Sequence, residues 1–428
     1  MLTIPEPMRI RDFQLYWVAR FAAVLATMGM VVIIGYQVYD TARADYGMSI
    51  RDAALMLGLL GLVQFVPLAL LTPVAGWVAD RYERRTVARL ANAIDMSVAL
   101  ALGWFSFNDA LTLPILFFFA ALHGVARVFV NPAMAAIAPN IVPPKQLPQA
   151  IAMSSIAWQV GSVAGPAIGG FLYASNPALP YWCAAALMLL AILALTPIRR
   201  VVPPPIKGES HPIRQMAEGL TYVRRHRFLL GAITLDLFAV LLGGAIAMLP
   251  VFARDILHVG PQGLGLLRAA PAVGASVVAL WFAFFPLRHN VGMKMLLAVA
   301  AFGAMTLLFG LSRNMQLSLL VLALLGAFDM FSVYVRSSLV QLHTPDSMRG
   351  RVSAVSGLAL SASNELGELQ AGVMAALLGP TAAVVVGGTA AMGIAGLWSY
   401  LFPEIRRART FDPPETALAE AIMEEKPA

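Results

Sequence analysis

Long apolar runs separated by short polar, charged or proline-containing segments repeat along almost the whole chain. Read against turn and charge clusters, the runs predict helices long enough to cross a bilayer, which takes about 20 apolar residues each. The predicted helices cover residues 14–38, 53–78, 86–107, 112–135, 148–174, 179–197, 229–253, 262–286, 292–311, 315–338, 351–378 and 382–402. The pattern therefore predicts an all-α membrane protein with twelve transmembrane helices.

The composition excludes a water-soluble enzyme. Apolar residues make up 59% of the chain and charged residues 12%, against about 45–50% and 25% in soluble domains. The single cysteine, Cys183, cannot form an internal disulfide or a thiolate metal site, and the histidines show no ligand spacing and no neighbouring carboxylate pattern. No phosphate-binding glycine loop is present. We therefore expect no enzymatic activity, no metal, no cofactor and no ATP as energy source.

The basic residues are distributed unevenly over the connecting segments. If both termini are cytoplasmic, most arginines and lysines fall on that side, and only Arg43, Arg51, Arg254 and Arg313 fall in the opposite loops. Positive charge concentrates on the cytoplasmic side of membrane proteins. This bias predicts a multi-pass protein of a bacterial-type inner membrane with both termini in the cytoplasm, and no nucleic-acid partner despite the net charge of +7.

The longest polar connection divides the helices into two sets of six. We expect an N-terminal bundle over 1–198, a cytoplasmic linker over 199–228, a C-terminal bundle over 229–402 and a cytoplasmic tail over 403–428. Within the linker, the basic segment 214–227 predicts a helix at the membrane surface. LHGVARVF in the first half aligns with LLGAFDMF in the second, and RFAAVLA with DLFAVLL. The bundles are therefore predicted to be pseudo-symmetric parallel repeats, as in several transporter folds.

The loop after the second predicted helix carries a specific signature. It resembles the pattern G-x-x-x-D-R-x-G-R-[RK] of the major facilitator superfamily, matched by Gly76, Asp80, Arg81, Arg84 and Arg85. Glu83 replaces the second glycine, and this variant is similar to the enterobactin-exporter-like branch of the superfamily. The resemblance implies that the loop braces a gate, whereas the alternative is a basic loop that only obeys membrane topology.

The fifth predicted helix is similar to the antiporter signature of proton-coupled exporters in the superfamily. The matching residues are Gly161, Gly165, Pro166, Gly169 and Gly170. Small residues at such spacing let helices approach closely and a proline bends the helix, so the motif could equally serve packing alone. We take it to favour export over import.

The resemblance extends through residues 130–153, 247–275, 338–357 and 363–372, and so covers nearly the whole chain. It implies the major facilitator fold, alternating access, and proton-driven export of a small molecule, either a siderophore or a drug-like compound, by a monomer in the lipid bilayer. The alternatives are a nutrient importer of the same fold and a membrane sensor that no longer transports.

Four ionisable residues lie at membrane depth on the helices that, by resemblance, line the central cavity. A charge at the bilayer centre costs at least about 2.5–3.5 kcal/mol, so each is a candidate functional residue. The repeat pairs Arg20 with Asp236 and Arg127 with Asp329. We expect these pairs to form an inner gate that protonation of an aspartate loosens. The alternative is pairing within each half, for example of Arg127 with Asp95.

Two glutamates near the middle of the eleventh predicted helix are candidate proton or substrate residues. Glu365 and Glu368 are three residues apart and can face one direction. Alternatively, they hold a cationic cargo or pair with Arg268. Arg336 is expected to extend its side chain to the nearby membrane surface.

Overall fold

The computed structural model describes residues 5–200 and 212–411 of the 428-residue chain. The described part is helical and contains no β-strand. The first half consists of α1 (Arg11–Ala44), α2 (Ile50–Arg81), α3 (Arg84–Phe107), α4 (Leu113–Ile141), α5 (Leu147–Ser175) and α6 (Leu179–Leu195). The second half consists of α8 (Arg227–Gly243), α9 (Leu249–Val251), α10 (Gly260–Phe284), α11 (Val291–Leu311), α12 (Met315–Leu342), α13 (Asp346–Leu378) and α14 (Pro380–Leu401).

Within the described residues, ten helical spans are long and apolar enough to cross a membrane, judged by length and composition. The remaining two of the twelve predicted spans are α6, which has only 17 residues, and α13, which carries Glu365 and Glu368 in its middle. All twelve predicted segments coincide with helices, and the all-α membrane fold is confirmed. Between the halves lies α7 (Pro212–Arg225) within the expected linker, and α15 (Pro403–Arg407) follows the last span. Residues 201–211 and 412–428 of the expected linker and tail lie outside the described residues.

Local sequence sets several helix ends. Ser49 caps α2 by accepting a hydrogen bond from the amide of Asp52, and the side chain of Asn314 accepts from the first amides of α12. Such caps satisfy donors that have no partner inside the helix. Gly379, with φ of 90°, ends α13 and precedes the proline that begins α14. Glycine reaches this backbone conformation without a steric penalty, so the chain can reverse direction here.

The seventh span is not the continuous helix that 229–253 predicted. α8 ends at Gly243, Gly244 takes the left-handed conformation with φ of 46°, and a 3-10 turn (Ile246–Met248), α9 and a π-helical turn (Phe252–Ile256) follow. A Cβ at Gly244 would lie 2.8 Å from the Cβ of Ala371 on α13. The break therefore depends on glycine both for its backbone angle and for the space beside α13.

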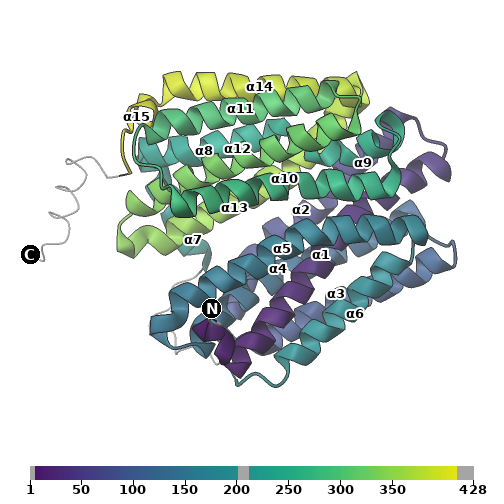
Figure 1. Ribbon diagram of the computed structural model, residues 1–428, viewed down its shortest axis with the longest axis horizontal. Helices are drawn as coiled ribbons and strands as arrows, with labels where there is room; N and C mark the ends of the chain where they lie inside the picture. The colour runs from purple at the N-terminus through teal and green to yellow at the C-terminus, as the bar shows by residue number, and fades with distance from the viewer. Residues whose placement is uncertain (1–4, 201–211, 412–428) are drawn as a thin grey trace, which may run out of the picture.

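The helices form two bundles. In the first, α1 packs on α5 and α6, and α4 packs on α2 and α3; in the second, α11 packs on α12 and α14, and α8 packs on α13 and α14. Figure 1 shows the first bundle below the second, with the bundles close together at the right and diverging to the left. The main contacts between them are α2 with α13 and α5 with α10. We call the left side, where α1 begins and α14 ends, the terminal side, and the opposite side the far side.

Glycines allow the two bundles to touch near the far side. A Cβ at Gly372 of α13 would lie 2.5 Å from the Cα of Gly58 on α2, and a Cβ at Gly170 of α5 would lie 3.0 Å from the Cα of Gly265 on α10. Side chains would prevent backbones from approaching this closely, as in other membrane helices that cross at small residues. The far side of the interface is thus closed by backbone contact.

We expect Gly372→Leu to open the far side, because the new side chain must push α13 away from Gly58. The measurement is labelling of Val31→Cys, a cavity residue, by a membrane-impermeant thiol reagent applied to the far side, in a protein whose native Cys183 is replaced by Ser. Labelling should rise several-fold. Gly357→Leu on the same helix is the control, because open space surrounds Gly357. Equal labelling of the two variants would contradict the expected separation.

Candidate functional site

A cavity of about 770 Å³ lies between the two bundles. Its wall combines α1, α2, α4 and α5 of the first bundle with α8, α10, α12 and α13 of the second. The volume falls within the roughly 300–1,000 Å³ of typical ligand sites. Among the described lining residues, the charged ones are Arg127, Arg268, Asp329, Glu365 and Glu368. The two halves therefore share one charged chamber that could receive a small molecule.

Arg127 links the two bundles across this cavity. Its Nη1 lies 3.8 Å from Oε1 of Glu365 on α13 and donates a 3.1 Å hydrogen bond to Oε1 of Gln64 on α2. The arginine side chain is 26% exposed and the glutamate side chain 12% exposed, so water screens the pair only partly. The sequence suggested Asp329 or Asp95 as the partner of Arg127, whereas in this structure Glu365 is the nearest acid.

Glu368 and Arg268 lie toward the far side of the same chamber. A Cβ at Gly61 of α2 would lie 2.6 Å from the Cβ of Glu368, so this glycine makes room for the glutamate. Arg268 of α10 donates a 3.5 Å hydrogen bond to the carbonyl oxygen of Ile246, at the break in the seventh span. Arg268 also interacts electrostatically with Glu368 and Glu365. With every group ionised, the cavity wall carries one more negative than positive charge.

Asp236 and Arg336 form a buried ion pair within the second bundle. The Arg336 Nη1 to Asp236 Oδ2 distance is 2.7 Å, and the residues are 5% and 4% exposed. The expectation that Arg336 extends to the membrane surface is wrong, because α8 and α12 pack together and enclose its guanidinium group. Removing two charges from water requires that each finds a close partner, and here that partner lies in the same half.

Of the four residues expected to form the inner gate, only Arg127 and Asp329 line the cavity. Asp329 interacts electrostatically with the Asp236–Arg336 pair. Arg20 is held inside the first bundle, where its Nε donates a 3.3 Å hydrogen bond to the carbonyl oxygen of Ser154 on α5. Arg20 and Asp236 are therefore engaged within separate halves in this conformation, and their pairing in another state stays a prediction.

A buried histidine–carboxylate pair was missed by the sequence analysis. His123 Nδ1 of α4 lies 2.6 Å from Asp95 Oδ1 of α3, and the two side chains are 0% and 3% exposed. The sequence gives no local signal for this pair, because residues 28 positions apart meet only when α3 packs on α4. His123 lies about one helical turn before Arg127. The pair therefore restrains the rotation of the helix face that also carries Arg127.

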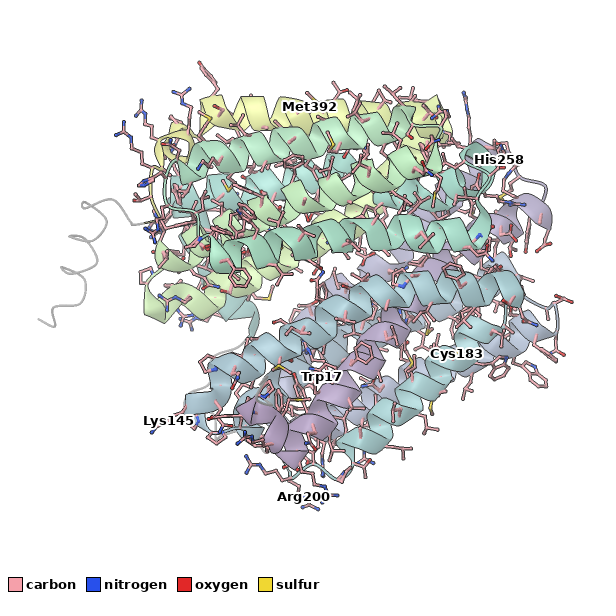
Figure 2. All side chains as sticks on the ribbon, in the orientation of Figure 1. Trp17, Lys145, Cys183, Arg200, His258 and Met392 are labelled. Atoms are coloured by element: carbon pink, nitrogen blue, oxygen red, sulfur yellow. The ribbon has the colours of Figure 1, made fainter. Side chains whose placement is uncertain are left out.

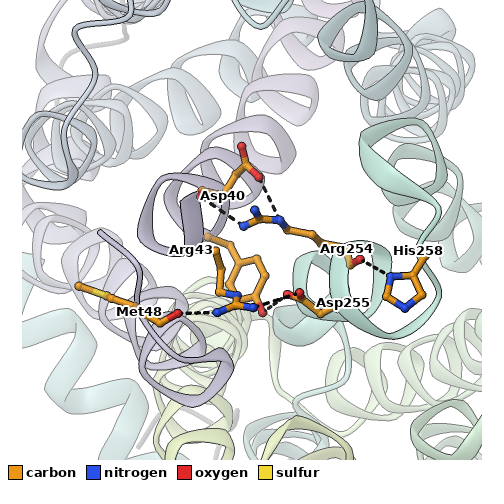
Figure 3. Close-up of polar contacts among 7 residues, drawn as sticks. Asp40, Arg43, Met48, Arg254, Asp255 and His258 are labelled. Carbon is orange, nitrogen blue, oxygen red and sulfur yellow. Dashed lines mark hydrogen bonds and ion pairs between the residues drawn. The ribbon is translucent and has the colours of Figure 1, made fainter. Parts of the chain in front are cut away.

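A second polar cluster joins the bundles on the far side (Figure 3). Nε of Arg254 lies 3.2 Å from Oδ1 of Asp40, and Nη2 of Arg43 lies 3.5 Å from Oδ1 of Asp255. The hydroxyl of Tyr39 donates a 2.5 Å hydrogen bond to Oδ2 of Asp255. We call these five residues the far-side network. The sequence offered a signal for it, since acid and base lie at the same end of two spans that the repeat relates.

The loop signature makes structural contacts. Arg84 donates a 3.2 Å hydrogen bond to the carbonyl oxygen of Ala136 on α4, and Arg81 stacks over the ring of Trp77 at 4.9 Å. Glu83, which replaces the signature glycine, forms an ion pair with Arg85, and the distance from Glu83 Oε1 to Arg85 Nε is 3.0 Å. Arg85 also donates to the carbonyl oxygen of Ile198 after α6. Gly76 has open space around it, and the side chain of Asp80 lies outside the described residues.

The glycines of α5 face two different neighbours. A Cβ at Gly165 would lie 3.0 Å from the amide nitrogen of Gly29 on α1, and Gly161 and Gly169 face the same helix. Gly170 instead faces α10 of the other bundle, and Pro166 lines the cavity. The motif therefore holds α5 against α1 and also forms part of the contact between the bundles.

Comparison with known proteins identifies the family. The pattern of the Major Facilitator Superfamily matches residues 19–367. The chain belongs to the Major Facilitator Superfamily. It is 28% identical over 420 residues to the enterobactin exporter EntS of Escherichia coli O127:H6, covering 95% of both chains, and 30% identical over 424 residues to EntS of Citrobacter koseri, covering 94% of both.

Solved structures show the same fold at low sequence identity. The nucleoside transporter NupG superposes with a TM-score of 0.74 at 13% identity, over 91% of this chain and 100% of that one. A bacterial homologue of the lysosomal transporter Spinster, in an inward-facing and occupied conformation, gives 0.71 at 16% identity, over 93% and 98% of the chains. The major facilitator protein described here is thus a multi-pass membrane transporter and not an enzyme.

We expect the far-side network to stabilise closure of this transporter on the far side. Arg254→Asp places two acids together at Asp40 and should shift the protein toward the far-side-open state. Partly exposed ion pairs contribute up to about 1 kcal/mol, so loss of the pair should shift the equilibrium up to about fivefold, and repulsion between the two acids should add to this shift. The combined variant Asp40→Arg/Arg254→Asp should recover closure, as measured by far-side labelling of Val31→Cys. A double variant that labels as strongly as the single one would contradict the pairing.

The buried pair in the second bundle predicts a loss of stability. Asp236→Asn leaves Arg336 without its counter-ion and should lower the free energy of unfolding by about 3–5 kcal/mol. Asp236→Asn/Arg336→Gln should recover most of the loss in the unfolding midpoint of the purified protein. Asp12→Asn is the control, because its partner Arg199 is 60% exposed. Equal midpoints for Asp236→Asn and Asp12→Asn would show that the buried pair is not structural.

Proposed function

We propose that this transporter is a proton-coupled exporter that moves a small molecule out of the cytoplasm by alternating access. The observation that carries the proposal is the cavity between the bundles, where acids of the second bundle face an arginine of the first. Such a site can exchange a proton for a cargo, and the exchange changes an ion pair that joins the two bundles. The loop and α5 motifs, which resemble those of exporters, support the same direction of transport.

The orientation follows from the positive-inside bias. Exposed basic residues gather on the terminal side, among them Lys145 and Arg200 at the open end of the first bundle (Figure 2). We therefore assign the terminal side to the cytoplasm of a bacterial-type cell and the protein to its inner membrane. The segments 1–198 and 229–402 are then the two moving bundles, and α7 in the 199–228 linker lies at the cytoplasmic surface. In this assignment the described state has its far side, the periplasmic side, closed.

Protonation of the cavity acids would couple the proton to the motion. A proton on Glu365 removes the charge that faces Arg127 at 3.8 Å, which weakens the link between α4 and α13. A proton on either Glu368 or Asp329 would instead cancel the excess negative charge of the chamber. In the opposite state we propose that Arg127 meets Asp329 and that Arg20 meets Asp236, after Asp236 has separated from Arg336.

The cargo proposed is an amphipathic molecule, a siderophore or a drug-like compound. Both relatives named above are enterobactin exporters. The cavity wall combines apolar side chains such as Met28, Trp158 and Met330 with the charged groups, which suits a molecule with both apolar and ionic parts. A nutrient importer of the same fold and a non-transporting sensor are the alternatives. Protonation of the glutamates that face the two arginines would leave these arginines able to pair with an acidic cargo.

The test is uptake of enterobactin and of ethidium into inside-out vesicles driven by an imposed proton gradient. We expect Glu365→Gln and Glu368→Gln each to lower gradient-dependent uptake by at least tenfold, because neither variant can release a proton. Glu404→Gln, at an exposed carboxylate of α15, should transport like the wild type. Gradient-dependent uptake at the wild-type rate in both cavity variants would exclude these acids from proton coupling. Movement of neither compound in the wild type would favour the importer or the sensor.

A further inference from the structure

We propose that the second bundle binds an anionic phospholipid in a groove between α10 and α11. The groove has a volume of about 660 Å³ and is separate from the central cavity, with which it shares no lining residue. α10 and α11 both pack along α12 but make no extensive contact with each other. Figure 1 shows α12 between them. The groove is thus open on the outside of the bundle, where a transporter meets lipid.

One end of the groove is cationic. Arg288, His289 and Lys294 line it where α10 ends and α11 begins, on the terminal side. All three are exposed, and within the described part of the chain their side chains form no hydrogen bond or ion pair. The sequence has no acidic residue between Asp255 and Asp329. The positive charge at this edge therefore has no neutralising partner on either helix that forms the groove.

The rest of the groove is apolar and extends toward the middle of the membrane. Lys294, Leu297, Ala298 and Ala301 follow the spacing of one helix face, and from Lys294 to Ala301 this face descends about 10 Å. The small alanines leave a depression along α11. Phe331 of α12 and Trp281 of α10 complete the walls. The apolar part of the groove can hold an acyl chain, and the basic residues at its end can bind the phosphate of the same lipid.

A neutral lipid would fill only the apolar part of the groove, and a free phosphate would bind only its basic end. Zwitterionic headgroups carry their own positive charge, which the basic rim repels, and a phosphate without an acyl chain leaves the apolar depth empty. Basic pockets between membrane helices near a surface are known to take anionic headgroups. The ligand class indicated by the whole groove is therefore a phospholipid with a net negative headgroup, such as phosphatidylglycerol.

The test is native mass spectrometry of the full-length protein in detergent with phosphatidylglycerol, phosphatidylcholine or glycerol phosphate. We expect the wild type to retain one phosphatidylglycerol in preference to the other two. Arg288→Gln/His289→Gln/Lys294→Gln should weaken this retention about thirtyfold, since each lysine or arginine at the surface contributes about 1 kcal/mol. The matched control is Arg9→Gln/Lys145→Gln/Arg200→Gln, three exposed basic residues of the first bundle.

A second variant tests the apolar part without changing charge. Ala301→Phe should fill the groove and displace the lipid, whereas Ala301→Ser should retain it, and both proteins should unfold at similar temperatures. Equal retention of phosphatidylcholine by the wild type would overturn the proposal. So would equal losses in the groove and control triple variants, which would indicate attraction by surface charge alone, or full retention by Ala301→Phe.

Discussion

The need of every buried charge for a partner organises this transporter. An ionised side chain in hydrocarbon is expensive, and the ion pairs described here are of two kinds. Asp95 with His123 and Asp236 with Arg336 are enclosed within a single bundle. Arg127 with Glu365 and Asp40 with Arg254 connect the bundles. Pairs of the first kind stabilise each bundle in the described state. Pairs of the second kind can exchange when the bundles move.

The closed far side combines a steric contact with ion pairs. Backbones meet at Gly58 and Gly372, where the contact is insensitive to charge, and the far-side network adds ion pairs between the bundles. In the cavity wall, α2 and α13 carry Gln64 and Glu365, and both side chains make polar contacts with Arg127. The pair of helices α2 and α13 therefore combines a steric glycine contact and a charged contact within a few helical turns. The break at Gly244 lies beside α13 as well, so changes at the acids can be transmitted to the seventh span.

Much of the fold could be predicted from the sequence because hydrophobic runs have a length that only a bilayer explains. The twelve spans, the break between halves and the family signatures all follow from local patterns. The prediction of a continuous seventh helix was wrong. Gly243 and Gly244 do not interrupt the apolar pattern of the sequence, and the break at Gly244 depends on the close approach of α13. Four of the six proposed proton or gate residues line the cavity, whereas Asp236 is enclosed with Arg336 and Arg20 is held by α5.

The sequence by itself determined which side chains are charged at membrane depth, and roughly how deep each lies, because helix rise and apolar length are local properties. It could not determine their partners. Arg336 and Asp236 are 100 residues apart, and the rotation of α12 against α8 decides that they meet. Likewise, the packing of α3 on α4 gives Asp95 to His123 and leaves Arg127 free to face Glu365. Pairing is a property of helix rotation and contact, and only the tertiary structure fixes these.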